Sequence, residues 1–229
     1  MICLAKRTKK DELSLETNKD RERFYKKMDK DQLALFNSIQ DNIFTFCEAK
    51  SGTGKTVVSV NALLNLLFLS KINHIIYIQK TSDRFLEHGF LPGDISAKTD
   101  ALWTPFYEAM ATLGYQPQKV EQFIQQESII LTTDSNLRGI NFEKCGIILD
   151  EAENCDTETL KLIFTRCHDD CHIVMLGDRL QKDNKGNHNQ DFVEYGDYLA
   201  NSNIGNKCCL TKNYRGKFSQ LAEDFKEEL

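Results

Sequence analysis

Short apolar runs alternate with helix-forming stretches along most of the chain. Runs with the length and continuous apolar character of buried strands lie at residues 43–47, 74–78, 128–131, 146–149 and 172–176. Between the first two runs, residues 57–69 form a strongly apolar stretch of helical length. A strand–helix–strand unit of this kind predicts a parallel sheet with a right-handed crossover. The pattern therefore predicts an α/β domain built on a mostly parallel central sheet, with helices on both faces.

The rest of the pattern predicts one domain after a charged lead-in. Further helices are expected over residues 31–39, 96–113, 120–126 and 191–200 and from residue 216, with another strand over 207–211. Residues 1–28 are rich in charge and poor in apolar residues, which predicts a solvated or partly disordered segment ending in a short helix. Residues 29–229 contain no internal repeat and no shift in composition, so we expect them to form a single domain.

Composition restricts the possible partners. The net charge of −5 gives no overall attraction to nucleic acid, so binding to RNA or DNA would need a local basic patch. The basic run at residues 6–10 is better explained as a solvated tail than as a phosphate contact. No apolar run approaches the roughly 20 residues that a membrane helix needs, and the N-terminus lacks a signal-peptide core. We therefore expect a cytoplasmic protein that does not bind membranes.

The eight cysteines are expected to be reduced thiols, because the sequence has no secretory signal. Cys167 and Cys171, the neighbouring His168 and His172, and the pair Cys208-Cys209 could in principle form a zinc site. The spacing is not that of a standard zinc knuckle, and Cys171 and His172 lead directly into an apolar strand. Free thiols are therefore the favoured interpretation, and zinc is the alternative.

The first predicted strand is followed by a small-residue loop that matches a Walker A phosphate loop with Ala in place of the first Gly. Its residues are Ala49, Lys50, Ser51, Gly52, Thr53, Gly54, Lys55 and Thr56. The glycines allow positive φ and close backbone approach to phosphate oxygens, and the following helix N-terminus favours anions. Lys55 would reach the β- and γ-phosphates, and the Thr56 hydroxyl would be a ligand of Mg²⁺. The alternative is a tight loop that carries a surface lysine.

The apolar run at residues 146–149 ends in two adjacent carboxylates, Asp150 and Glu151. Placing them at the end of a buried strand is costly unless a cation compensates the charge. This is the Walker B pattern, in which Asp150 would hold Mg²⁺ and Glu151 would polarise the attacking water. The alternative is an acidic helix N-terminus after a core strand, and the phosphate loop upstream makes it the weaker explanation.

A further polar cluster follows the run at residues 172–176 and includes Gly177, Asp178 and Gln181. Polar residues at the carboxyl end of a parallel strand belong on the ligand side of an open α/β sheet. An ordinary surface turn is the alternative.

Together these motifs resemble the PhoH-like proteins, a family of P-loop ATPases related to superfamily 1 helicases. The resemblance extends from Gln32 to about Asp183 and includes the segment GFLPGD at residues 89–94, Arg138-Gly139, and Gly177-Asp178 with Gln181. It implies a RecA-like domain that binds ATP and Mg²⁺ at the carboxyl ends of its strands. It also implies that Gln32 reads adenine and that Gln181 senses the γ-phosphate.

Two departures from the family pattern lie close to the predicted site. Glu153 replaces the glutamine of the family's DEAQN segment, which adds a third carboxylate that either affects nucleotide binding or faces solvent. Gln79-Lys80 replaces the family's Arg-Pro, and Lys80 is not an equivalent substitute for arginine.

The resemblance implies ATP hydrolysis in which Lys55, Mg²⁺ and an arginine neutralise the transition state while Glu151 orients water. The helicase relation implies stimulation by single-stranded RNA or DNA, and the alternative is a slow nucleotide-dependent switch or scaffold. A kinase would need an acceptor-substrate motif, and none is evident. Motor work by one domain would require a homo-oligomer, for example a ring, in which a neighbouring subunit supplies the arginine. Arg215, in the helicase-like segment 213–216, is the first candidate and Arg138 the second.

Overall fold

A computed structural model describes residues 19–80, 102–137, 140–179, 189–218 and 221. The GFLPGD segment, Arg138, Gln181 and Asp183 lie outside the described residues.

The sheet has six strands in the order β3-β2-β4-β5-β1-β6, and every pairing of neighbours is parallel. The strands are β1 (Phe44–Ala49), β2 (His74–Gln79), β3 (Ile129–Thr133), β4 (Cys145–Asp150), β5 (His172–Gly177) and β6 (Gly205–Leu210). The predicted parallel sheet is confirmed. Because β5 lies between β1 and β4, the carboxyl ends of these three strands meet at one edge of the sheet.

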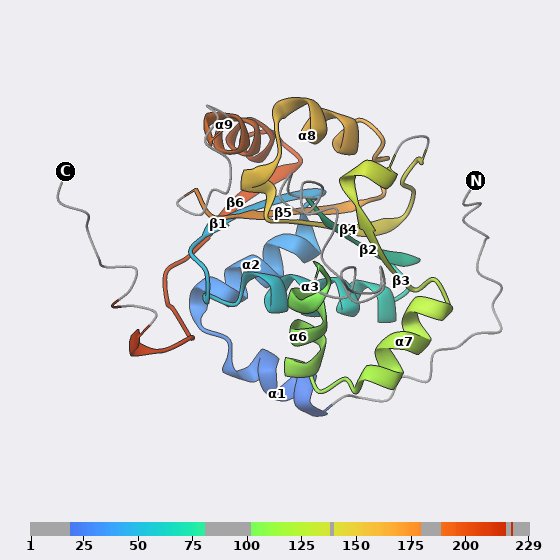
Figure 1. Cartoon of the computed structure of the whole chain (residues 1–229), viewed down its shortest axis with the longest axis vertical. Coiled ribbons are helices and arrows are strands. Elements are labelled where there is room, and N and C mark those ends of the chain that lie inside the picture. Colours follow the sequence, from blue (N-terminus) through green and yellow to red (C-terminus); the bar gives the residue numbers. More distant parts are fainter. Residues whose placement is uncertain (1–18, 81–101, 138–139, 180–188, 219–220, 222–229) are drawn as a thin grey trace, which may run out of the picture.

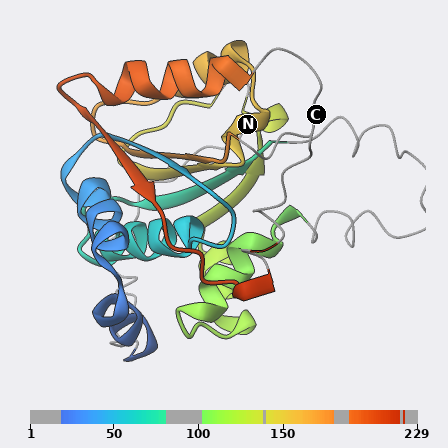
Figure 2. The same ribbon diagram turned by 90° about the vertical axis from the view of Figure 1, so that its left-hand side faces the viewer.

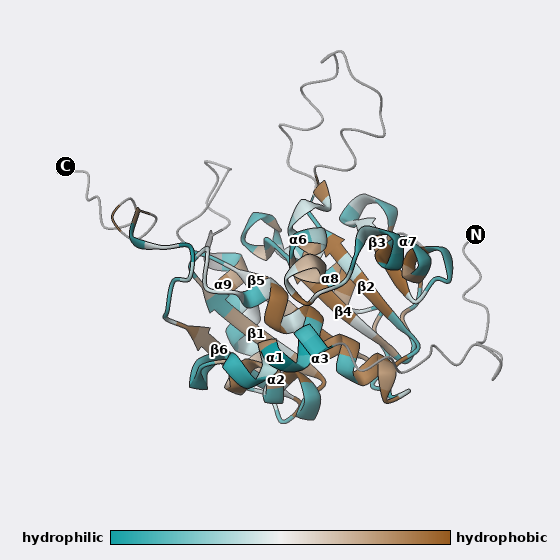
Figure 3. Ribbon diagram, turned by 90° about the horizontal axis from the view of Figure 1, so that it is seen from below, coloured by the Kyte–Doolittle hydropathy of each residue, from teal (hydrophilic) through white to brown (hydrophobic). Residues whose placement is uncertain are grey.

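Helices cover both faces of the sheet, as predicted. The α-helices are α1 (Lys19–Lys27), α2 (Lys30–Asp41), α3 (Lys55–Phe68), α6 (Thr104–Thr112), α7 (Pro117–Gln125), α8 (Thr157–Phe164) and α9 (Asn189–Ala200), with short 3-10 helices η1 (Asp134–Asn136) and η2 (Ala152–Asn154). Figure 1 shows α8 and α9 on one face and α2, α3, α6 and α7 on the other. The strands run between these layers (Figure 1), and Figure 3 shows apolar residues along β2 and β4. Each face therefore has its own apolar core.

Helix α2 has a strong start signal in the sequence. The Asp29 side chain accepts hydrogen bonds from the backbone N–H groups of Asp31 and Gln32, each at 2.9 Å. The Gln32 side chain in turn accepts a hydrogen bond from the Asp29 backbone N–H. This capping box satisfies N–H groups that the first turn leaves unpaired. It also holds Gln32 in a defined, buried position beside the phosphate loop.

Some element boundaries differ from the predicted ones. The helix expected at residues 120–126 begins at Pro117 instead. Proline suits the first helical turn because the missing N–H would have no partner there, so Pro117 starts α7 as well as ending the preceding connection. The helix expected at 96–113 is described from Thr104 to Thr112, and residues 81–101 lie outside the described part.

Two further findings concern membranes and metals. None of the helices within the described ranges is long and apolar enough to cross a membrane. The Sγ atoms of Cys145 and Cys171 lie 3.6 Å apart at the start of β4 and β5, whereas Cys208 lies on β6. The described residues contain no cluster of His, Cys, Asp and Glu that could hold a metal ion. The alternative zinc site therefore has no support in this part of the chain.

Candidate nucleotide site

The phosphate loop connects β1 to α3 directly. Ala49 ends the strand and Lys55 begins the helix. Gly52 and Gly54 have φ values of 76° and 85°, in the left-handed region that glycine adopts without strain. The Thr53 hydroxyl donates to the Lys50 carbonyl at 2.9 Å and closes the loop from within. The loop thus has the local geometry that the sequence predicted for residues 49–56.

The two predicted metal ligands meet at the carboxyl end of β4. The Thr56 hydroxyl donates a hydrogen bond of 2.8 Å to Oδ2 of Asp150. Asp150 is only 3% exposed, and the same Oδ2 accepts a second hydrogen bond of 2.8 Å from the Tyr77 hydroxyl. Hydroxyl and carboxylate oxygens are ligands that Mg²⁺ prefers. The donor set therefore fits Mg²⁺, and Thr56 and Asp150 are the residues that would hold it.

Glu151 differs from Asp150 in both exposure and backbone conformation. Its side chain is exposed, and its φ of 53° lies in the left-handed region, which is unfavourable for a residue with a side chain. Gln79 on β2 donates a hydrogen bond of 3.3 Å to its Oε2. Strained backbone of this kind clusters at functional sites. Glu151 therefore adjoins Asp150 but differs from it in exposure and backbone conformation.

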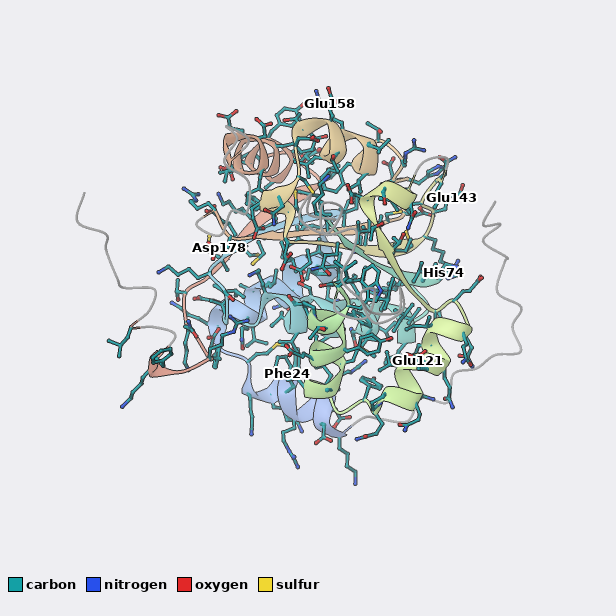
Figure 4. The ribbon with its side chains drawn as sticks, in the orientation of Figure 1. Phe24, His74, Glu121, Glu143, Glu158 and Asp178 are labelled. Atoms are coloured by element: carbon teal, nitrogen blue, oxygen red, sulfur yellow. The ribbon has the colours of Figure 1, made fainter. Side chains whose placement is uncertain are left out.

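Asp178 connects the end of β5 to the phosphate loop. Its Oδ2 accepts a hydrogen bond of 3.2 Å from the Ser51 backbone N–H. Asp178 is 4% exposed, so this residue is not part of an ordinary surface turn, and the predicted cluster from residue 180 onward lies outside the described residues. Asp178, which is labelled in Figure 4, directly follows the carboxyl end of β5. Its contact with Ser51 follows from the position of β5 next to β1.

Gln32 lies against the phosphate loop. Its Nε2 donates a hydrogen bond of 3.2 Å to the Thr53 carbonyl, while its Oε1 belongs to the capping box of α2. Gln32 therefore joins the start of α2 to the loop. Its reading of adenine stays a prediction.

The segment after β6 returns to the phosphate loop. The Tyr214 backbone N–H donates to the Gly52 carbonyl at 2.8 Å, and the Tyr214 hydroxyl donates to Oδ2 of Asp29 at 2.7 Å. The Arg215 side chain packs so closely on Gly52 that a Cβ atom there would lie 2.9 Å from its Cγ. Figure 2 shows this segment, in red, leaving the carboxyl end of β6. Arg215 thus lines the cavity of its own chain, and an arginine supplied by a neighbouring subunit stays a prediction.

These elements surround one cavity of about 560 Å³, a size typical of small-molecule sites. Its lining comprises Phe24, Lys27, Gln32, Ser51, Gly52, Gly54, Lys55, Thr56, Val57, Pro105, Glu108, Ala109, Thr112, Asp150, Glu151, Glu153, Tyr214 and Arg215. Ala49, Lys50 and Thr53 belong to the loop but do not line the cavity. Sequence reasoning missed Phe24 and Lys27, because they belong to a charged lead-in helix without a motif.

Lys80 forms an ion pair with Asp134 and does not face the cavity. Its Nζ lies 2.7 Å from Oδ2 of Asp134 at the end of β3, and both side chains are largely buried. The pair lies at the carboxyl ends of β2 and β3, and Lys80 does not line the cavity.

Glu153 does not face solvent. The residue is 4% exposed, and its Oε2 has no hydrogen-bond partner in the described part of the chain. Gly177 leaves room for it, because a Cβ on that glycine would lie 2.7 Å from Oε2. Burial raises the pKa of Glu153 to about 8, although nearby backbone N–H groups and the charge of Lys55 act in the opposite direction. At neutral pH the folded protein therefore favours the protonated carboxyl group.

This shift predicts how stability depends on pH. In the unfolded chain Glu153 ionises near pH 4.5, whereas in the folded chain it keeps its proton until about pH 8. Between these values the unfolded chain releases the proton and the folded chain keeps it, so the free energy of unfolding falls as pH rises. Glu153→Gln stays neutral, so we expect its melting temperature to exceed that of the parent by at least about 3 °C at pH 8.5.

Thermal denaturation at pH 5 and pH 8.5 measures this effect. The expected difference is small at pH 5 and grows with pH. Glu158→Gln, which removes an exposed carboxylate on α8, serves as the control and should show no such growth. An equal difference at both pH values would show that Glu153 is ionised in the folded protein.

The sequence matches the model of a known protein family. The family model described as PhoH-like protein matches residues 25–215, which is more than half of the chain. The chain belongs to the PhoH-like family. The resemblance inferred from the sequence motifs is thereby confirmed.

Curated PhoH-like relatives extend beyond the matched region. The chain is 30% identical over 156 residues to a PhoH-like protein of Synechocystis sp., covering 66% of this chain and 46% of that protein. It is 27% identical over 153 residues to protein PhoH of Escherichia coli, covering 66% and 43%. The chain thus spans less than half the length of these relatives.

Solved structures with similar folds include phage and helicase proteins. The large terminase of a thermophilic bacteriophage superposes with a TM-score of 0.54 at 15% identity, covering 87% of this chain and 50% of that protein. The DUF1998 helicase MrfA, bound to DNA and AMPPNP, superposes with a TM-score of 0.50 at 12% identity, covering 90% and 30%. At these identities the likeness establishes the fold alone. The predicted RecA-like P-loop fold of this PhoH-like chain is confirmed.

Proposed function

We propose that this PhoH-like chain binds ATP and hydrolyses its β–γ phosphoanhydride bond in a Mg²⁺-dependent reaction. The observation that carries the proposal is the 2.8 Å contact between Thr56 and Asp150, which joins the phosphate loop to the end of β4. Lys55 and Glu151 line the same cavity. A phosphate-binding loop, a metal-ligand pair and a candidate water-orienting carboxylate thus surround one space.

The roles of the side chains follow from their positions. Lys55, at the N-terminus of α3, binds and neutralises the β- and γ-phosphates together with the loop N–H groups. Glu151 is exposed to the cavity and orients the attacking water, whereas Asp150 and Thr56 hold the metal ion. Bound Mg²⁺ would neutralise charge that develops on the phosphate oxygens. Catalysis in this site is mainly positioning and electrostatic stabilisation.

We also propose that single-stranded RNA or DNA stimulates the hydrolysis. The support is the family membership together with a RecA-like fold that a DNA-bound helicase shares. The test is steady-state ATP hydrolysis with and without single-stranded RNA and single-stranded DNA, on protein whose mass in solution has been measured. Increased turnover with either polymer supports stimulation. Tight ATP binding with little turnover under all conditions would favour the slow switch or scaffold instead.

Arg215 is proposed to act on the nucleotide bound by its own chain. Its side chain packs on Gly52 and lines the cavity, so no neighbouring subunit is needed to bring it there. We therefore expect no recovery of activity when Lys55→Ala subunits are mixed with Arg215→Ala subunits. Recovery in the mixture would show instead that Arg215 acts across a subunit interface. A homo-oligomer stays a prediction, which the measured mass tests separately.

A further inference from the structure

Strand β2 carries two polar side chains at its carboxyl end, and each donates a hydrogen bond to one of the adjacent carboxylates on β4. Tyr77 donates to Asp150, and Gln79 donates to Glu151. Residues separated by two positions on a strand lie on the same face of the sheet. β2 pairs directly with β4, with Gln79 opposite Asp150. The two contacts therefore follow from the register of neighbouring strands.

Tyr77 is fixed by its surroundings. The residue is fully buried, and its ring packs against Trp103 and Phe106 with centroid distances of 6.4 Å and 5.2 Å. Its hydroxyl lies 2.8 Å from Oδ2 of Asp150, the same oxygen that accepts from Thr56. The hydroxyl is the donor in this contact, because a carboxylate only accepts hydrogen bonds. It can hold one oxygen of Asp150 in place while the carboxylate binds a metal ion.

Gln79 has a comparable relation to Glu151. Its side chain is 6% exposed, and its Nε2 lies 3.3 Å from Oε2 of Glu151. A carboxylate only accepts hydrogen bonds, so the amide nitrogen is the end that faces it. The other end, Oε1, is buried and has no partner among the residues that the structure describes. Burying an oxygen without a hydrogen-bond partner costs free energy, which an apolar residue at this position would avoid. The contact with Glu151 is therefore the evident reason for an amide here.

We propose that β2 is the positioning strand of the site: Tyr77 orients Asp150 toward the metal ion, and Gln79 orients Glu151 toward the attacking water. The inference rests on the proposed function. It assigns roles to two residues that contact Asp150 and Glu151 rather than the nucleotide or the metal ion. Partners of this kind typically change metal affinity or activity by about 10- to 100-fold when they are removed. The two residues should affect different steps, because each contacts a different carboxylate.

Tyr77→Phe tests the first half of the proposal. It removes only the hydroxyl, so we expect the Mg²⁺ concentration for half-maximal ATP hydrolysis to rise by about 10-fold, with little change in kcat at saturating Mg²⁺. Calorimetric titration of Mg²⁺ into the protein with saturating ADP should show the same loss of affinity without any turnover. Tyr107→Phe is the matched control, because it removes an equal 2.8 Å bond to Glu121 on the surface. The control should leave both measurements unchanged.

Gln79→Met tests the second half, because methionine has a similar shape but cannot donate a hydrogen bond. We expect kcat to fall by about 10-fold while the Mg²⁺ dependence and the affinity for ADP are retained. In a chain that already carries Glu151→Gln, the same substitution should cause no further loss, since Gln79 acts through Glu151. Gln40→Met is the control, because Gln40 donates to the Ala62 carbonyl on α3, away from the cavity.

Several results would overturn the proposal. Equal changes in kcat and Mg²⁺ dependence in both variants would contradict the separate roles. An additional loss from Gln79→Met in the Glu151→Gln background would contradict action through Glu151. Failure of either variant to fold, judged by thermal denaturation, would assign that residue to stability alone. A parent protein that binds Mg²⁺ and ADP without hydrolysing ATP would refute the proposed hydrolysis, and the titrations would still test Tyr77.

Discussion

Lys55→Ala is expected to reduce ATP hydrolysis to below about one per cent of the parent rate, which is the scale of effect seen when one electrostatic stabiliser is removed. Lys55 begins α3 and lines the cavity, and its side chain is only half-buried. It therefore contributes a positive charge to the site without filling space in the apolar core. Binding of a fluorescent ATP analogue and steady-state phosphate release would measure the two consequences.

Lys161→Ala is the matched control for this variant. Lys161 is an exposed helical lysine on α8, on the opposite face of the sheet. Both variants should keep the melting temperature of the parent, and only Lys55→Ala should lose nucleotide binding or hydrolysis. Full ATPase activity in Lys55→Ala would show that the loop is not the phosphate site.

The local parts of the site could be predicted because their signals lie in consecutive residues. The left-handed φ values occur at Gly52 and Gly54, where the loop sequence requires glycine. Thr56 and Asp150 were expected to share a metal ion, and their side chains are in contact. The loop geometry needed only a strand, a small-residue loop and a helix in the correct order. The contact between Thr56 and Asp150, which are 94 residues apart, was expected only because the two motifs together imply one metal ion.

Contacts between distant segments could not be predicted in the same way. Asp178 meets Ser51 because β5 lies next to β1, and Tyr77 meets Asp150 because β2 lies next to β4. In the sequence Tyr77 belongs to an apolar strand and has no feature that distinguishes it from a core residue. A stronger clue was present at Gln79, a polar residue at the end of a buried run. Its partner depended on strand pairing.

The burial of Glu153 could not be predicted from the sequence either, although its neighbours in the sequence belong to a recognised motif. In the sequence it follows two functional carboxylates, and its exposure was left open. Its enclosure depends on η2, on the absence of a side chain at Gly177 and on Phe192 of α9, which also packs against that glycine. These contacts bring together three segments. No local pattern therefore identified Glu153 as a buried acid.

Glu151→Gln should bind ATP and Mg²⁺ like the parent but hydrolyse ATP at least about 100-fold more slowly, within the range for losing a positioned acid–base group. Glu151 is exposed to the cavity and separate from the Thr56–Asp150 pair, so its neutralisation leaves the metal ligands intact. Asp150→Asn should instead weaken Mg²⁺ binding, because an amide is a poorer ligand than a carboxylate. Rapid-quench single-turnover hydrolysis and Mg²⁺ titrations would separate the two effects.

Glu158→Gln on α8 is the control for Glu151→Gln, because Glu158, labelled at the top of Figure 4, is an exposed glutamate that does not line the cavity. It should retain the parent rate and the parent Mg²⁺ dependence. If Glu151→Gln and Asp150→Asn both lost nucleotide binding to the same extent, the carboxylates would share one role in binding. If Glu151→Gln kept the parent hydrolysis rate, another group would have to orient the water. The strained backbone at Glu151 would then need a different explanation.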